Sequence, residues 1–359
     1  MKKADITFIR MANQQISSRK FKSVKELVGY MGAFQAQDYP MSKCAIGLRL
    51  EDATEQTINN AIDKGEIIRT HILRPTWHFV STDDISWMLK LTASKIRTSM
   101  SSRNKELELT EAVFKKSNKI IISALSGNNH LTREEIVALL NKAKIKTDNN
   151  RASHLLAEAE LTGIICGGKS KRNKHTYALL EERVPIDIKM TMDGAASKLA
   201  GIYFKSHGPA SVQDFSWWSG LNLNTAKKAL EMIKHELVSF NSDTLTYWYS
   251  GILIENKDKK ESVYLLPTYD EYMISYRDRT AVIIDEDHRK VISNNGIFRA
   301  LIVVNGKITG TWRRMITKDK VMLEFEHFKQ PDKKLKQLIE KEAARFGRFL
   351  GKRIELNNL

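Results

Sequence analysis

Leu131-Thr132-Arg133-Glu134-Glu135-Ile136-Val137 begins the stretch that decides the fold of this chain. Thr132 stands where a helix cap is expected, and Glu135 follows three residues later, which is the spacing of a capping box. A second helix is predicted over residues 151–161, and strand-like runs follow at residues 164–166 and 176–180. Two helices followed by a β-hairpin, or wing, are typical of the winged-helix module.

The loop of this predicted wing is strongly cationic. It reads Gly167-Gly168-Lys169-Ser170-Lys171-Arg172-Asn173-Lys174-His175. Wings commonly touch the phosphates of DNA, so the candidate DNA-binding residues are Lys169, Lys171, Arg172 and Lys174. The alternative is a solvated loop with no ligand.

The same order of elements occurs two more times along the chain. An earlier copy, at about residues 5–80, ends in strand-like runs, and a later copy, at about residues 194–249, ends in a hairpin. We therefore predict an α+β fold of tandem winged-helix units. The predicted segments are a first unit at 1–117 with the Gln-x-Gln motif, a second at 118–190, a third at 191–251, and a C-terminal domain at 252–359.

The C-terminal domain is predicted to consist of antiparallel strands and a final helix. Asn305-Gly306 is the strongest hairpin signal in the chain. The candidate strands are 262–267, 281–284, 299–304, 307–312 and 322–325. Strands of this number and length favour a small β-barrel or curled sheet, and the amphipathic residues 333–350 form the terminal helix.

Charge and composition limit the classes of function. The net charge of +16 favours a polyanionic partner, either nucleic acid or an anionic membrane surface, although a merely solubilising lysine-rich surface is the alternative. Membrane binding lacks an apolar anchor of about 18 residues. Cys44 and Cys166 are far apart and match no metal spacing, which fits a reducing cytosol. We expect a cytoplasmic protein, associated with the nucleoid when bound to DNA, with no cofactor and no metal.

Two glutamines in Phe34-Gln35-Ala36-Gln37 form the candidate catalytic motif. An amide cannot ionise, so it is not a strong general base, but it can hold a water by accepting and donating hydrogen bonds. A site built from two neutral amides suits a reaction whose leaving group is already activated. On residue type alone, two glutamines near a helix end are more often solvated polar residues.

Four segments in this order resemble the winged-helix DNA glycosylases of the AlkZ/YcaQ type. They are Phe34-Gln35-Ala36-Gln37, Arg74-Pro75-Thr76-Trp77-His78, Leu266-Pro267-Thr268-Tyr269-Asp270-Glu271-Tyr272 with Tyr276-Arg277-Asp278-Arg279, and Asn305-Gly306-Lys307 through Gly310-Thr311-Trp312-Arg313-Arg314. The resemblance implies three winged-helix units in a C-shape, a C-terminal β-barrel, and removal of alkylated purines from DNA. It also implies that Gln35 and Gln37 are the catalytic pair, in the version similar to the branch that acts on bulky N7-alkylguanine adducts.

The resulting hypothesis is a monofunctional, metal-independent DNA glycosylase. Gln35 and Gln37 would position a water beneath C1′ of a cationic N7- or N3-alkylpurine nucleotide, in bulky adducts or crosslinks as well as simple ones. Its partner would be double-stranded, alkylated DNA, and we expect a monomer. The alternatives are a non-catalytic winged-helix DNA-binding protein or transcriptional regulator and, less favoured, a scaffold that binds proteins.

Further candidates flank the motifs. Arg74, Thr76 and His78 would support the site through phosphate contacts or by holding the catalytic loop, although a lone histidine between aromatic residues is more often part of the core. The carboxylates Asp270 and Glu271 are either catalytic or structural. We favour a structural network in which they pair with Arg277 and Arg279, next to Asp278.

Overall fold

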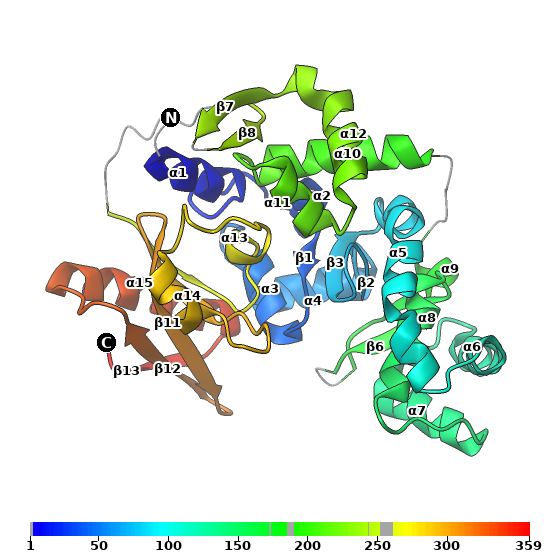
Figure 1. Ribbon diagram of the computed structural model, residues 1–359. Coiled ribbons are helices and arrows are strands. Elements are labelled where there is room, and N and C mark those ends of the chain that lie inside the picture. Colours follow the sequence, from blue (N-terminus) through cyan, green and yellow to red (C-terminus); the bar gives the residue numbers. More distant parts are fainter. Residues whose placement is uncertain (1–2, 172–173, 185–189, 243, 252–260) are drawn as a thin grey trace. The chain divides into compact units, whose positions relative to one another are not determined.

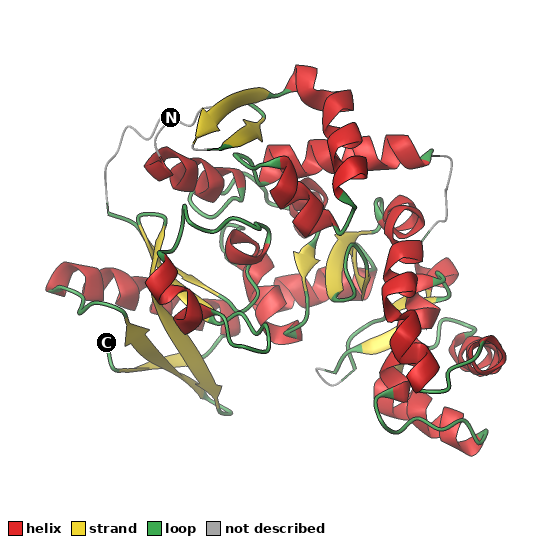
Figure 2. Cartoon of the chain, in the orientation of Figure 1, coloured by secondary structure: helices red, strands yellow, loops and turns green. Residues whose placement is uncertain are grey.

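The computed structural model describes residues 3–171, 174–184, 190–242, 244–251 and 261–359. Helices and strands alternate along the chain, which confirms the predicted α+β class (Figure 2). Packing divides the chain into two compact units. Unit 1 comprises Met1–Ile58 and Ser197–Leu359, and unit 2 comprises Asn59–Ala196. The division into four segments stays a prediction.

The elements are labelled in Figure 1. The helices are α1 Lys3–Asn13, α2 Val24–Met31, α3 Tyr39–Gly47, α4 Glu55–Lys64, α5 Ile85–Glu106, α6 Glu111–Leu125, α7 Arg133–Lys142, α8 Arg151–Leu161, α9 Leu180–Arg183, α10 Met192–Ser206, α11 Val212–Ser219, α12 Leu223–Ile233, the 3₁₀ turn η1 Lys234–Glu236, α13 Glu271–Ile274, α14 Asp285–Val291 and α15 Lys333–Leu350. The strands are β1 Phe34–Gln35, β2 Ile67–His71, β3 Trp77–Ser81, β4 Leu131–Thr132, β5 Ile165–Gly167, β6 Thr176–Leu179, β7 Val238–Ser242, β8 Leu245–Tyr249, β9 Val263–Leu266, β10 Ala300–Val304, β11 Lys307–Ile316, β12 Lys320–His327 and β13 Arg353–Asn357.

One order of elements recurs three times: helix, short strand, helix, helix, and two further strands. It is α2-β1-α3-α4-β2-β3, then α6-β4-α7-α8-β5-β6, then α10, the single residue Ala210, α11-α12-β7-β8. In the second copy β4 and β5 pair with opposite edges of β6, and in the third Ala210 bridges to Trp248 of β8. This is the order of a winged-helix module, in agreement with the sequence pattern.

Local capping explains where several of these helices begin. The Thr132 hydroxyl accepts from the Glu135 N–H, and the Glu135 carboxylate accepts from the Thr132 N–H, which confirms the predicted capping box of α7. Ser211 and Asp214 form an equivalent box at α11. Each cap satisfies N–H groups that have no partner within the helix.

Unit 2 contains two long helices that the sequence pattern did not predict, α5 and α6. The amphipathic pattern of α5 is weak, because its C-terminal half is exposed and polar while its first half is buried. Helix α8 packs against α5, and the unit's main core joins α6, α7, α8 and the strands β5 and β6. These contacts bury α8 along its whole length.

Unit 1 contains a five-stranded sheet in the order β13-β12-β11-β10-β9. Strand β13 runs parallel to β12, and the other neighbours are antiparallel. Helix α15 packs against β9 and β13, which are the two edges of the sheet among the described residues. The sheet is thus an open half-barrel, only part of the predicted barrel, and β13 was not foreseen.

One predicted strand is wrong. Residues 281–284 form a turn that leads into α14, in which the Val282 and Ile283 N–H groups donate to the Arg279 carbonyl. Val282 and Ile283 are buried in the core of unit 1, so their apolar character reflects packing of a turn. The other four predicted strands are confirmed, and Asn305 and Gly306 form the predicted turn between β10 and β11 with φ of 49° and 77°.

Within the described ranges, no helix combines the length and apolarity needed to cross a bilayer.

Candidate functional site

The Gln-x-Gln motif lies in unit 1 between β1 and α3. We call residues 35–38 the glutamine loop. Gln35 ends β1 and is 8% exposed, whereas the Gln37 side chain is exposed to solvent. Asp38 then caps α3, because its Oδ1 accepts from the Met41 N–H at 3.1 Å. The two predicted catalytic amides therefore have different surroundings, one enclosed and one open.

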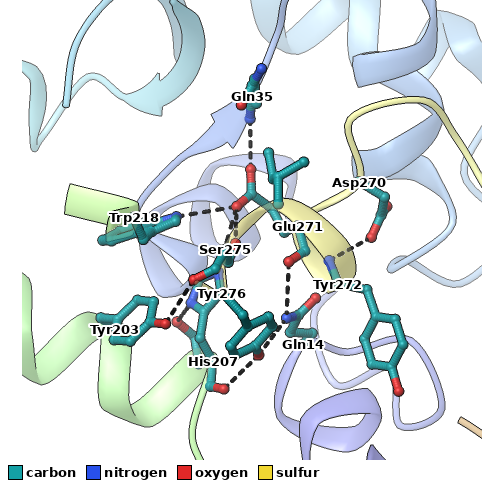
Figure 3. A network of polar contacts seen from close by, with 12 residues as sticks. Gln14, Gln35, Tyr203, His207, Trp218, Asp270, Glu271, Tyr272, Ser275 and Tyr276 are labelled. Carbon is teal, nitrogen blue, oxygen red and sulfur yellow. Dashed lines mark hydrogen bonds and ion pairs between the residues drawn. The ribbon is translucent and has the colours of Figure 1, made fainter. Parts of the chain in front are cut away.

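The Glu271 carboxylate holds the backbone of Gln35. Glu271 Oε1 accepts from the Gln35 N–H at 2.7 Å, and Oε2 accepts from Trp218 Nε1 at 3.1 Å and from the Ser275 hydroxyl (Figure 3). The carboxylate is fully buried. A buried charge is tolerated when hydrogen bonds satisfy it, and here three donors converge on two oxygens.

These contacts keep Glu271 ionised. Burial disfavours the charged form, but the His207 imidazole, the Ser275 hydroxyl and the Gln35 N–H outweigh it and lower the pKa of Glu271 to about 2. Burial also lowers the pKa of His207 from its ordinary value. Its Nε2 lies 3.8 Å from Glu271 Oε2, and its Nδ1 lies 2.8 Å from the Ser206 hydroxyl. Glu271 is therefore a hydrogen-bond acceptor for the Gln35 N–H, the Trp218 Nε1–H and the Ser275 hydroxyl.

A second contact joins the other end of the glutamine loop to the same segment of chain. The Thr268 hydroxyl donates to Asp38 Oδ2 at 3.1 Å. The sequence segments that carry Gln35 and Glu271 are 236 residues apart, yet two hydrogen bonds connect them. Both ends of the loop are fixed, and Gln37 lies between them.

Asp270 has a different partner from the one we predicted. Arg49 holds it with two bonds, Nη1 to Oδ2 at 2.8 Å and Nη2 to Oδ1 at 2.7 Å, and both side chains are fully buried. The expected pairing of Asp270 and Glu271 with Arg277 and Arg279 is thus corrected. The predictions missed Arg49 because it lies outside all four motifs.

The three other residues of that predicted network have separate roles. The backbone N–H groups of Arg277 and Asp278 both donate to Asp214 Oδ1, at 2.9 and 3.0 Å. Arg279 donates from Nε to the Met273 carbonyl and lies over the ring of Trp217. Together with Asp270–Arg49, these contacts fix the loop around α13.

Arg74, Thr76 and His78 belong to unit 2. His78 lies on β3 and is fully buried, and its Nδ1–H donates to the Thr76 carbonyl at 3.0 Å. The Thr76 N–H in turn donates to the Arg74 carbonyl at 2.7 Å. Arg74 and Thr76 are half-buried. The structure therefore brings these three residues together in one turn, and their supporting role stays a prediction.

The cationic wing of unit 2 is partly neutralised by α7. Lys171 Nζ lies 2.5 Å from Glu135 Oε1, and Lys174 Nζ lies 3.8 Å from Glu134 Oε2. Lys169, Lys171 and Lys174 are exposed, and Arg172 lies outside the described residues. Because α8 is buried, the helix that enters a DNA groove in many winged-helix proteins is covered in this copy. In the third copy α12 is amphipathic and exposes Lys227 and Lys228.

Sequence reasoning missed the residues that hold the site from a distance: Arg49, Ser206, His207, Asp214, Trp218 and Ser275. They stand on α10, on α11, just after α3, and in the turns that follow α10 and α13. No periodicity or spacing in the sequence marks them. Among the described residues, no group of three His, Cys, Asp or Glu side chains is arranged to hold a metal ion.

The recurring order of helices and strands, the half-barrel sheet and the glutamine loop together define the architecture that was compared with known proteins. The model of the DNA glycosylase AlkZ-like family matches residues 28–349, and the chain belongs to that family. A curated relative from Streptomyces sahachiroi, an interstrand DNA cross-link repair glycosylase, is 23% identical over 356 residues, which is 95% of each protein. The solved structure of the Streptomyces sahachiroi DNA glycosylase AlkZ has the same fold, with a TM-score of 0.78 and 20% identity over 99% of this chain and 100% of that one.

Proposed function

We propose that this protein is a monofunctional, metal-independent DNA glycosylase that hydrolyses the N-glycosidic bond of cationic alkylated purines, using a water positioned by Gln35 and Gln37. The observation that carries the proposal is the contrast within the glutamine loop. Gln37 presents an exposed amide, while the Gln35 backbone next to it is fixed by a buried carboxylate. A reactive side chain needs access, and its neighbour needs a defined position.

The chemistry of an N7- or N3-alkylpurine suits such a site. The alkylated base carries a positive charge, and its departure neutralises that charge, so the leaving group needs no proton. The transition state resembles an oxocarbenium ion, as in other cleavages of glycosidic bonds. An amide carbonyl that orients a water, and a second one whose dipole faces the developing cation, supply positioning and electrostatic stabilisation without a strong base.

The carboxylates around the loop support an amide-based mechanism. Both oxygens of Asp38 accept hydrogen bonds, from Met41 and Thr268. Asp270 is paired with Arg49, and Glu271 is satisfied by three donors. Each of these acids already has a structural partner, so Gln37 is the accessible polar side chain of the loop.

Family membership and charge support DNA as the partner. The net charge of +16 favours a polyanion, and the curated relative is described as a cross-link repair glycosylase. We infer that this chain acts as a monomer on alkylated duplex DNA, with bulky N7 adducts among its substrates.

The proposal is tested by measuring base release from a duplex that carries one N7-methylguanine. Gln35→Ala and Gln37→Ala should each slow release, whereas Gln337→Ala, which removes an exposed glutamine on α15, should not. Unchanged release in both loop variants would overturn the mechanism. DNA binding without any release by the wild-type protein would favour a winged-helix regulator that performs no chemistry.

A further inference from the structure

We propose that Glu271 and Thr268 are positioning residues, which act through the glutamine loop to hold Gln35 and Gln37 in place for base release. The inference rests on the function proposed above and adds residues that lie outside the Gln-x-Gln motif. Its basis is the pair of hydrogen bonds, Gln35 N–H to Glu271 and Thr268 hydroxyl to Asp38, that fix the two ends of a four-residue loop.

An ionised carboxylate is the side chain that these surroundings require at residue 271. Its three close partners, the Gln35 N–H, Trp218 Nε1–H and the Ser275 hydroxyl, are all donors (Figure 3). A carboxylate only accepts, whereas a glutamine at this position would direct an NH2 group at one of these donors. Glu271→Gln therefore has to give up either the bond to Gln35 or the bonds to Trp218 and Ser275.

The segment that carries Glu271 is itself held rigidly. Gln14 Nε2 donates to the Tyr276 hydroxyl at 2.9 Å, and that hydroxyl donates to the His207 carbonyl at 2.6 Å. The Tyr203 hydroxyl donates to the Ser275 carbonyl at 2.8 Å. A loop that is hydrogen-bonded to this rigid segment is held in a fixed position. A site that works by orienting a water requires such a fixed position.

Thr268 supplies the second anchor in a less buried setting. Its side chain is partly exposed, and its hydroxyl bonds Asp38, the residue directly after Gln37. Thr268→Val removes the hydroxyl at nearly constant volume, and Thr268→Ser restores it. This pair tests the anchor with little risk to folding, whereas a change at the buried Glu271 carries more.

The experiment compares single-turnover base release and DNA affinity, using a duplex with one N7-methylguanine as the probe. Glu271→Gln and Thr268→Val should lower the release rate by about 10- to 100-fold, since a displacement of about 1 Å costs that much. The dissociation constant for the duplex should stay within about twofold, and Thr268→Ser should recover the rate. The matched control is Tyr272→Phe. Tyr272 lies on the same helix as Glu271, and the change removes the buried hydrogen bond from its hydroxyl to the Gly306 carbonyl. This variant should leave the release rate unchanged.

A double-mutant cycle separates positioning from general destabilisation. If Glu271 acts through the glutamine loop, Glu271→Gln should add no further loss in a background that carries both Gln35→Ala and Gln37→Ala. An equal loss in both backgrounds would overturn the inference, as would wild-type rates for both Thr268→Val and a folded Glu271→Gln. Should Glu271→Gln fail to fold, Thr268→Val decides alone. Wild-type release by Gln35→Ala and Gln37→Ala would instead overturn the proposed function, so the two failures are distinguishable.

Discussion

Arg49 and Asp270 form a two-bond ion pair, at 2.7 and 2.8 Å, in which neither side chain is exposed to solvent. Arg49 also donates to the backbone carbonyls of Gln14 and Ala45, so one guanidinium connects the residue after α1, helix α3 and the start of α13. Asp270 directly precedes Glu271 in the sequence. The ion pair fixes the part of unit 1 that supports the glutamine loop.

Breaking this pair from one side should be costly. Arg49→Met would leave the Asp270 charge buried without a counterion, and we expect a loss of about 3–5 kcal/mol in the free energy of unfolding. Urea denaturation of purified protein measures this value. The double variant Arg49→Met with Asp270→Leu should lose less than Arg49→Met alone. A single variant within about 0.5 kcal/mol of wild type would show that the pair is not closed in solution.

Glu271 should make stability depend on pH in an acidic window. Its folded-state pKa is lowered from 4.5 to about 2, so the unfolded chain binds a proton more readily than the folded one. Its contribution is therefore fully present above pH 4.5 and is lost as pH falls towards 2. The difference in unfolding free energy between wild type and Glu271→Gln should shrink over this window in urea titrations. A difference that stays constant from about pH 6 to about pH 3 would contradict the ionised state.

Replacing Gln35 and replacing Gln37 should both slow base release but should affect stability differently. Gln37 is exposed, so Gln37→Ala should change the unfolding free energy by no more than about 0.5 kcal/mol while slowing base release. Gln35 is enclosed, so Gln35→Ala should slow release and also cost about 1 kcal/mol. Thermal melts beside the base-release assay check both values. Equal destabilisation by the two changes would mean that Gln37 is enclosed as well.

The wing of unit 2 should determine part of the salt dependence of DNA binding. Replacing Lys169, Lys171, Arg172 and Lys174 by glutamine should flatten the slope of log K against log salt by roughly 0.9 for each phosphate that the wing no longer neutralises. Glu134→Gln with Glu135→Gln releases Lys171 and Lys174 from their acidic partners and should raise affinity. The glutamine amide oxygen introduced by the second change can still accept from the Thr132 N–H, so α7 keeps its cap. An unchanged slope in the fourfold variant would place the wing away from DNA.

Local signals in the sequence predicted most of the fold. A cap such as Thr132 or Ser211 acts within four residues, and the turn at Asn305-Gly306 needs only positive φ angles, so both can be recognised without knowing the rest of the chain. Residues 281–284 failed because an apolar run of four has no periodicity of its own. Val282 and Ile283 are buried in a core cluster with Val291 of α14 and Ile308 of β11, whereas Ile284 is 60% exposed, and the sequence does not contain that information locally.

The site shows the same limit. The order of the four motifs gave Gln35, Gln37, Asp270 and Glu271 as candidates, but their partners could not be read from spacing. Arg49 is 221 residues from Asp270 in the sequence, and the sequence alone does not distinguish Arg49 from other charged residues as the partner of Asp270. Arg277 and Arg279 were chosen because they are close in sequence, whereas the fold brings Arg49 to the buried carboxylate instead.

Gly306 should be difficult to replace in the turn between β10 and β11. Its φ is +77°, and a Cβ at this position would lie 2.6 Å from Thr7 Oγ1 and 2.7 Å from Thr7 Cβ. Thr7 is buried on α1, and the Gly306 carbonyl accepts from the Tyr272 hydroxyl, so neither neighbour can move freely. Gly306→Ala should cost about 2–3 kcal/mol, from backbone strain together with the steric clash.

A second glycine of unit 1 separates these two causes. Gly296 has a similar φ of +71°, and a Cβ there would meet no atom within 4 Å. Gly296→Ala should therefore cost only the backbone term, about 1 kcal/mol. Urea denaturation of both variants gives the difference, which measures how tightly the turn packs on α1. An equal loss of unfolding free energy in the two variants would mean that Thr7 and the turn separate in solution. That result would contradict a fixed contact between α1 and the half-barrel.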